Sequence, residues 1–167
     1  MPEIVFDTCV ISNFALAGAL GVLEGLYGSR GRAHVTDFVA AEIVRGIQSG
    51  HARLEAIPKA GRAGWLKETG LRTGKERELF ETLSVSLGLG EASSIAIAKR
   101  RGYVLASDDR VARAEAGGLH IPVTGTLGIL IKAVKSGICD LRTADSYLEK
   151  MIRAGFFSPV CSVREIA

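Results

Sequence analysis

Acidic residues that could form one functional site occur at four separated positions along the chain. They are Asp7, Glu42, Glu91 and the adjacent pair Asp108 and Asp109. Taken singly, each has an ordinary structural explanation, because an aspartate after a strand often caps the next helix and a glutamate in a first helical turn is favoured by the helix dipole. These acids therefore indicate a function only if the fold brings them together.

Two of these positions follow short apolar runs that predict buried strands. Residues 3–7 end in Asp7, and residues 103–107 end just before the aspartate pair. The carboxyl ends of parallel strands lie at one edge of a sheet, where the ligand sites of α/β folds form. We therefore expect Asp7 and the aspartate pair to emerge at the same edge.

The two glutamates lie in helices that are expected to begin at that edge. Glu91 opens an alanine-rich helix, and Glu42 lies about a turn and a half inside a helix capped by Thr36 or Asp37. Because a helical Cβ is tilted toward the N-terminus of its helix, Glu42 is able to overhang the edge. The pattern thus predicts one pocket shared by carboxylates from all four positions.

Carboxylates gathered in this way require a cation. Without one they repel each other and take up protons, whereas hard divalent metals compensate the charge. Donors that are oxygen only, with no histidine or cysteine at ligand spacing, suit Mg²⁺ or Mn²⁺ better than Zn²⁺. Such metal sites commonly hydrolyse phosphodiesters through a hydroxide formed from bound water. Metal-dependent phosphodiester hydrolysis is therefore the predicted reaction class.

The elements that must position these acids alternate between strand and helix. The segment 51–74 supports no assignment, and the tail from about residue 156 is ambiguous. Alternation of this kind predicts a parallel sheet with helices on both faces. The expected strands are residues 3–7, 33–36, 103–107 and 121–123, and the expected helices are residues 8–16, 20–26, 37–50, 75–87, 91–101, 110–116, 126–135 and 143–154.

Composition restricts the class of protein. The chain has 167 residues, 47% of them hydrophobic, which predicts a single folded domain spanning residues 1–167. The net charge of +3 is compatible with a nucleic-acid substrate without requiring one. Three widely spaced cysteines indicate neither a disulfide framework nor zinc. No apolar run approaches the roughly 20 residues of a membrane span, so we expect a cytoplasmic protein with no membrane association.

Several sequence blocks, taken in order, resemble the PIN-domain nucleases, and among these the VapC-type toxins of toxin-antitoxin pairs. The resemblance covers nearly the whole chain, and its most specific part is the ordered set GEAS, SDDR and VTGTLG. It implies a three-layer α/β fold with five parallel strands, dependence on Mg²⁺ or Mn²⁺, and endonucleolytic cleavage of RNA. The blocks are IVFDTCVISNF, TDFVAAEI, GLGEASSIAIAKRRG, YVLASDDRVARAEAGG and IPVTGTLGIL.

The same resemblance implies a set of functional residues. Glu91 stands where the family most often has aspartate, and the fourth acid is doubled in this chain. We rank Asp108 above Asp109, because Asp109 is equally suited to capping the following helix. The implied catalytic acids are Asp7, Glu42, Glu91 and Asp108; Asp109 joins them as a metal ligand, and Thr8 and Ser107 are the hydroxyls that support them.

The binding partners of this protein are predicted more from the family resemblance than from individual residues. It implies an RNA substrate, a cognate antitoxin protein and a homodimer. Arg110 and Arg113 lie just after the aspartate pair, which makes them candidates for contacts with RNA phosphates.

Two alternative functions stay open at this point. A receiver-like regulatory module, phosphorylated on one aspartate, would explain Asp7 and the aspartate pair but leaves Glu42 and Glu91 without a task. A catalytically inactive PIN-like protein that only binds RNA would keep the fold. Cleavage of RNA separates both alternatives from a nuclease.

Overall fold

Five short parallel strands form the central sheet of this computed structural model, which describes residues 2–167. The strands are β1 (Ile4–Phe6), β2 (Ala33–Thr36), β3 (Leu66–Thr69), β4 (Val104–Ala106) and β5 (Val123–Thr124). Their order across the sheet is β3-β2-β1-β4-β5, with every neighbouring pair parallel. The predicted α/β fold with a five-stranded parallel sheet is confirmed.

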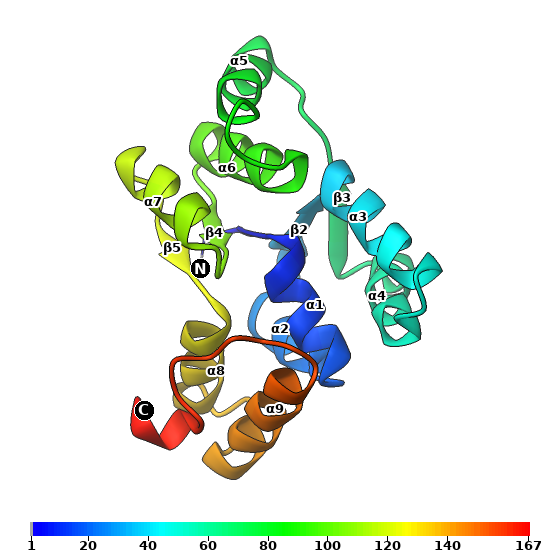
Figure 1. Cartoon of the computed structure of the whole chain (residues 1–167), viewed down its shortest axis with the longest axis vertical. Coiled ribbons are helices and arrows are strands. Elements are labelled where there is room, and N and C mark those ends of the chain that lie inside the picture. Colours follow the sequence, from blue (N-terminus) through cyan, green and yellow to red (C-terminus); the bar gives the residue numbers. More distant parts are fainter. Residues whose placement is uncertain (1) are drawn as a thin grey trace.

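Helices flank this sheet, as Figure 1 shows. In chain order they are α1 (Thr8–Leu16), α2 (Leu20–Tyr27), α3 (Asp37–Gln48), α4 (Ala56–Ala63), α5 (Gly74–Leu83), α6 (Leu89–Arg101), α7 (Arg110–Gly118), α8 (Thr126–Lys135) and α9 (Leu141–Arg153). Short 3₁₀ turns are η1 (Ser29–Gly31), η2 (Ala52–Glu55) and η3 (Val163–Glu165). Within residues 2–167 no single helix has the length and apolarity to cross a bilayer; α1 and α2 meet that test only together, across a 119° bend.

Side chains of β1 alternate between two hydrophobic cores. Ile4 and Phe6 are buried in a cluster formed with α1 to α4, α8 and α9, whereas Val5 packs on the opposite face with α5, α6 and α7. The Phe6 and Tyr27 rings pack edge to face, with centroids 5.9 Å apart. Because the sheet is covered on both faces, the strands β1 and β4 are apolar without interruption, which is why they are readable from the sequence.

The strands β1, β2 and β4 are each followed closely by a helix whose N-cap is a polar side chain. Asp7 is the N-cap of α1, Thr36 is the N-cap of α3, and Asp109 is the N-cap of α7. The Thr36 hydroxyl accepts a hydrogen bond from the amide of Val39 at 3.1 Å. This turn chemistry places several helix N-termini at the carboxyl edge of the sheet.

The structure differs from the sequence prediction at several boundaries. The helix predicted over residues 75–87 ends at Leu83, where Ser84 turns its hydroxyl onto the Glu81 carbonyl (3.0 Å). The strand predicted at residues 121–123 begins at Val123, since Pro122 has no amide hydrogen to donate. The helix predicted from residue 143 begins at Leu141, because Asp140 caps it.

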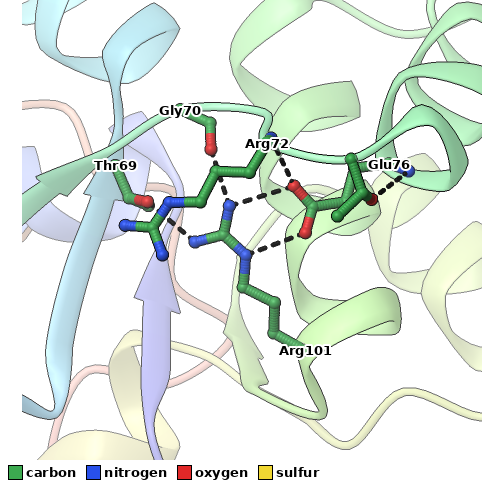
Figure 2. Close-up of polar contacts among 6 residues, drawn as sticks. Thr69, Gly70, Arg72, Glu76 and Arg101 are labelled. Atoms are coloured by element: carbon green, nitrogen blue, oxygen red, sulfur yellow. Dashed lines mark hydrogen bonds and ion pairs between the residues drawn. The ribbon is translucent and has the colours of Figure 1, made fainter.

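A buried ion pair fixes the segment between β3 and α5 (Figure 2). The Arg101 guanidinium donates to Glu76 at 2.9 and 3.0 Å, to the Thr69 hydroxyl at 2.7 Å and to the Gly70 carbonyl at 2.6 Å. The Arg101 and Glu76 side chains are only 12% and 4% exposed. The Arg101 hydrogen bond is the main cause that lowers the pKa of Glu76 to about 2. One side chain thus joins the end of α6 to the edge strand and the start of α5.

We predict that Arg101→Met destabilises the protein by about 3 kcal/mol, because it leaves the buried Glu76 carboxylate without a partner. Urea unfolding at pH 7 measures the change. The matched control is Arg153→Met, which breaks an exposed ion pair with Glu149 and is expected to change stability by less than about 0.5 kcal/mol. Equal urea midpoints for the two variants would contradict this role.

Candidate active site

Asp7 lies at the centre of the carboxyl edge, directly after β1. Its carboxylate is 3% exposed and accepts two hydrogen bonds, from the amide of Thr8 (2.7 Å) and from the hydroxyl of Ser107 (3.0 Å). Ser107 is itself fully buried, and its hydroxyl oxygen also accepts the amide of Asp109 at 3.2 Å. These contacts hold the Asp7 carboxylate in one orientation between β1 and β4.

Glu42 reaches the same edge from α3. Its Oε2 accepts a hydrogen bond of 2.5 Å from the Thr8 hydroxyl. Its carboxylate also lies against the first turn of α6, because a β-carbon added at Gly90 would come within 2.5 Å of Glu42 Oε1. Glycine at position 90 is therefore what allows the Glu42 side chain to lie between α1 and α6. The expected overhang of Glu42 is present.

Glu91 stands beside this contact, in the first turn of α6. The start of α6 is held by buried hydroxyls: Ser93 and Ser94 donate to the Gly90 carbonyl at 2.9 and 2.7 Å. The Ser93 hydroxyl is also hydrogen-bonded to that of Thr36, at 2.8 Å. Glu91 is thereby positioned relative to β2 and α3.

The negative charges of these acids raise the pKa values of Asp7 and Glu91. Burial raises the pKa of Asp7 to about 6, with smaller contributions from the negative charges of Glu42 and Asp109 and an opposing effect of its hydrogen bonds. Burial also raises the pKa of Glu91 to about 7, helped by the charges of Asp7, Asp109 and Glu42. Acids from four places in the sequence thus share one electrostatic environment.

The two adjacent aspartates have different surroundings. Asp108 accepts from the amide and the hydroxyl of Thr126, at 2.9 and 2.5 Å, and from the Asn13 amide at 3.4 Å, so its carboxylate stabilises the start of α8. Asp109 accepts from the amide of Ala112 at 2.8 Å, and its charge acts on both Asp7 and Glu91. Asp109 is therefore the member of the pair that acts on the other acids.

The donor set fits a hard cation. Within residues 2–167, none of the ion pairs involves a site acid, so the negative charge has no basic side chain bonded to it. Among the described residues, no group of three acidic, histidine or cysteine side chains is arranged so that it could hold a metal ion. Carboxylate oxygens are the ligands that Mg²⁺ and Mn²⁺ prefer, and hydrogen bonds from the Thr8 and Thr126 hydroxyls orient the carboxylates of Glu42 and Asp108.

The basic candidates are placed differently from one another. Arg113 donates to the Ser107 carbonyl at 2.7 Å, so it supports the loop after β4. Arg110 begins α7 and is exposed. Asn13 and Thr126 are not among the predicted site residues, yet their side chains are hydrogen-bonded to each other at 3.1 Å and to Asp108. Thr126 opens α8, whereas Asn13 lies in the second turn of α1, so only the fold shows that they meet.

Comparison with known proteins agrees with this architecture. A sequence model of a protein family described as a PIN domain matches residues 3–167. No curated protein and no solved structure matched the chain. PIN domains are generally nucleases and typically use divalent metals. Since the match spans nearly the whole chain, this protein belongs to the PIN-domain family.

Proposed function

We propose that this protein is a metal-dependent endoribonuclease that hydrolyses RNA phosphodiesters at its carboxyl-edge acids. The observation that carries the proposal is that Asp7 and Glu42 both accept hydrogen bonds from Thr8, while the Glu42 carboxylate also lies against Gly90, the residue before Glu91. Burial and the charges of neighbouring acids raise the pKa of Asp7 and of Glu91 at this edge. A folded protein that keeps such groups together has uncompensated negative charge, which a divalent cation relieves. Membership of the PIN-domain family supports the same reaction class.

Asp7, Glu42, Glu91 and Asp109 are the residues that we propose as metal ligands. When bound, Mg²⁺ or Mn²⁺ would supply a hydroxide from water and neutralise charge on the leaving oxygen. Ser107 and the Thr8 amide hold Asp7 in place while leaving each of its oxygens a further lone pair. Because a ligand carboxylate must be deprotonated, metal affinity is expected to rise with pH through the pKa values of Asp7 and Glu91.

The environments of the aspartate pair favour Asp109 over Asp108 as the fourth ligand. Asp108 accepts three hydrogen bonds, from the amide and hydroxyl of Thr126 and from the Asn13 side chain, whereas the charge of Asp109 acts on Asp7 and Glu91. This reverses the order in which the sequence ranks the two residues.

Among the alternatives, the receiver-like module gains least support. It gives Glu42 and Glu91 no task, yet the charge of Glu42 acts on both Asp7 and Glu91. The resemblance of the GEAS, SDDR and VTGTLG blocks supports a narrower proposal, in which the protein is the toxin of a toxin-antitoxin pair, forms a homodimer and is restrained by a cognate antitoxin protein.

We predict that Asp7→Asn lowers the rate of RNA cleavage in Mn²⁺ by at least about a hundredfold, because a neutral amide weakens the metal site at its centre. The assay measures cleavage of a mixed RNA pool by purified protein, with Mn²⁺ or with EDTA. Glu149→Gln, a neutralised acid on the exposed face of α9, is the control and should cleave at the parental rate. Cleavage that persists in EDTA, or in Asp7→Asn, would reject the mechanism; a parent that binds RNA but never cleaves it would favour the inactive alternative.

A second prediction separates the aspartate pair. Asp109→Asn should reduce cleavage by about a hundredfold or more with little loss of stability, because an asparagine still caps α7. Asp108→Asn should instead lower the free energy of unfolding by about 1 kcal/mol, since its amide group replaces one acceptor of the Thr126 contacts, and should cleave faster than Asp109→Asn. Parallel cleavage and urea-unfolding measurements test both statements. The opposite ranking of cleavage rates would return the ligand role to Asp108.

A further inference from the structure

Phe157 is the most exposed of the large hydrophobic side chains in the described residues, at 95%. It follows the C-terminal end of α9, where Gly155 has a φ of 113° and reverses the chain. The preceding residue, Phe156, is half-buried against the main core, and its amide donates to the Met151 carbonyl at 2.9 Å. Two adjacent phenylalanines thus face opposite ways, one into the protein and one into solvent.

The segment that carries Phe157 is held at both ends. On its far side, Val163 is fully buried, and its amide and the Ser162 hydroxyl donate to Asp145 at 2.6 and 2.9 Å. Between the anchors, the Ser158 hydroxyl donates to the Val160 carbonyl at 2.6 Å. In Figure 1 this segment, coloured from orange to red, crosses near the start of α8. The exposed ring is therefore presented from an anchored loop and not from a loose terminus.

Phe157 borders the acidic edge. It lines a hollow of about 320 Å³ together with Cys9, Asn13, Asp108 and Asp109. It also lines a neighbouring hollow of about 410 Å³ that includes Asp108 and Arg113. A single exposed hydrophobic residue needs no explanation by itself. Here the ring lies beside the aspartate pair, so a substrate bound at the acids would lie next to it.

We propose that Phe157 is a stacking platform for a base of single-stranded RNA next to the phosphate that is cleaved. The inference rests on the proposed nuclease function and adds a residue that positions the substrate. Such a residue would act on unpaired bases, because paired bases in a duplex are already stacked and do not offer a free face. Stacking on an aromatic ring is tolerant of base identity and is a main source of affinity in single-strand binding. Phe157 would act as a positioning residue.

Charge explains why an aromatic ring suits this place. The carboxylates repel RNA phosphates, and a lysine or arginine there would pair with the same acids and compete with a metal ion. A neutral ring adds affinity without neutralising the site. Its contribution should therefore depend little on salt concentration, unlike contacts to phosphates.

The test compares three substitutions at position 157 in cleavage of a single-stranded oligoribonucleotide with Mn²⁺. Phe157→Ala and Phe157→Leu should both lower kcat/KM by about tenfold, mainly through KM and equally at low and moderate salt. Phe157→Trp should retain the parental value. Val85→Ala removes a side chain of similar exposure, 88%, that follows α5, and serves as the matched control with unchanged kinetics. A fully exposed side chain should not affect folding, which urea unfolding verifies.

A spectroscopic measurement distinguishes stacking from other roles. In a Phe157→Trp, Asp7→Asn double variant, single-stranded RNA should quench tryptophan emission beyond the change seen with Asp7→Asn alone, which contains only Trp65. A duplex of the same sequence should not.

Several results would overturn the proposal. If Phe157→Leu equals the parent, the contact is hydrophobic without stacking. If Phe157→Ala lowers the mass of the protein in solution, the ring packs against a second copy of the chain. A parent that cleaves normally beside unaffected Phe157 variants overturns this inference alone, whereas a parent that cleaves no RNA overturns the nuclease proposal and this inference with it.

Discussion

Negative charge gathered at the carboxyl edge of the sheet is the interaction on which the rest of this structure depends. Parallel strands bring Asp7 and Asp109 to one edge, and the N-termini of α3 and α6 bring Glu42 and Glu91 toward it. Burial and mutual repulsion raise the pKa of Asp7 and Glu91, so the metal-free protein is less stable with these groups ionised than with them protonated. The arrangement is therefore unfavourable for folding alone and is explained by a ligand that carries positive charge.

The surrounding framework holds the acids against that repulsion. Two hydrophobic cores clamp the sheet from both faces, and hydroxyl groups of Thr8, Ser107 and Ser93 fix the local geometry. Farther from the site, Arg101 joins α6 to the edge strand β3, which fixes the helix that carries Glu91. Packing and polar contacts thus both hold the elements that carry the acids at one edge of the sheet.

Much of this arrangement was predictable from the sequence, for identifiable physical reasons. Residues 4–6 and 104–106 are continuous apolar runs, because central parallel strands are buried on both faces, and the caps at Asp7 and Thr36 mark the helices after their strands. β3 gave no comparable signal, since Lys67 and Glu68 face solvent at the edge of the sheet.

Other features depend on tertiary contacts that spacing does not encode. The difference between Asp108 and Asp109 arises from Thr126, which lies 18 residues away in the chain. Arg101 lies in the last turn of α6, where any basic residue interacts favourably with the helix dipole. Its buried ion pair with Glu76 is therefore visible only in the folded structure. The place of Phe157 beside the acids likewise follows from a tail whose sequence has no periodic pattern.

The free energy of unfolding as a function of pH, compared between the parent and Asp7→Asn, tests the gathering of charge most directly. In EDTA, Asp7→Asn should exceed the parent by about 2 kcal/mol at pH 8, and the gap should close toward pH 4, because an acid with a raised folded-state pKa loses stability as the pH rises through that pKa. Groups that titrate in both proteins, such as His34, contribute equally to both free energies of unfolding, so their contribution cancels in the difference.

Addition of Mn²⁺ at pH 8 completes the measurement. The account predicts that Mn²⁺ stabilises the parent much more than Asp7→Asn, because a cation compensates the charge that the substitution removes. Equal stability of the two proteins across this pH range, together with the same response of both to Mn²⁺, would contradict it.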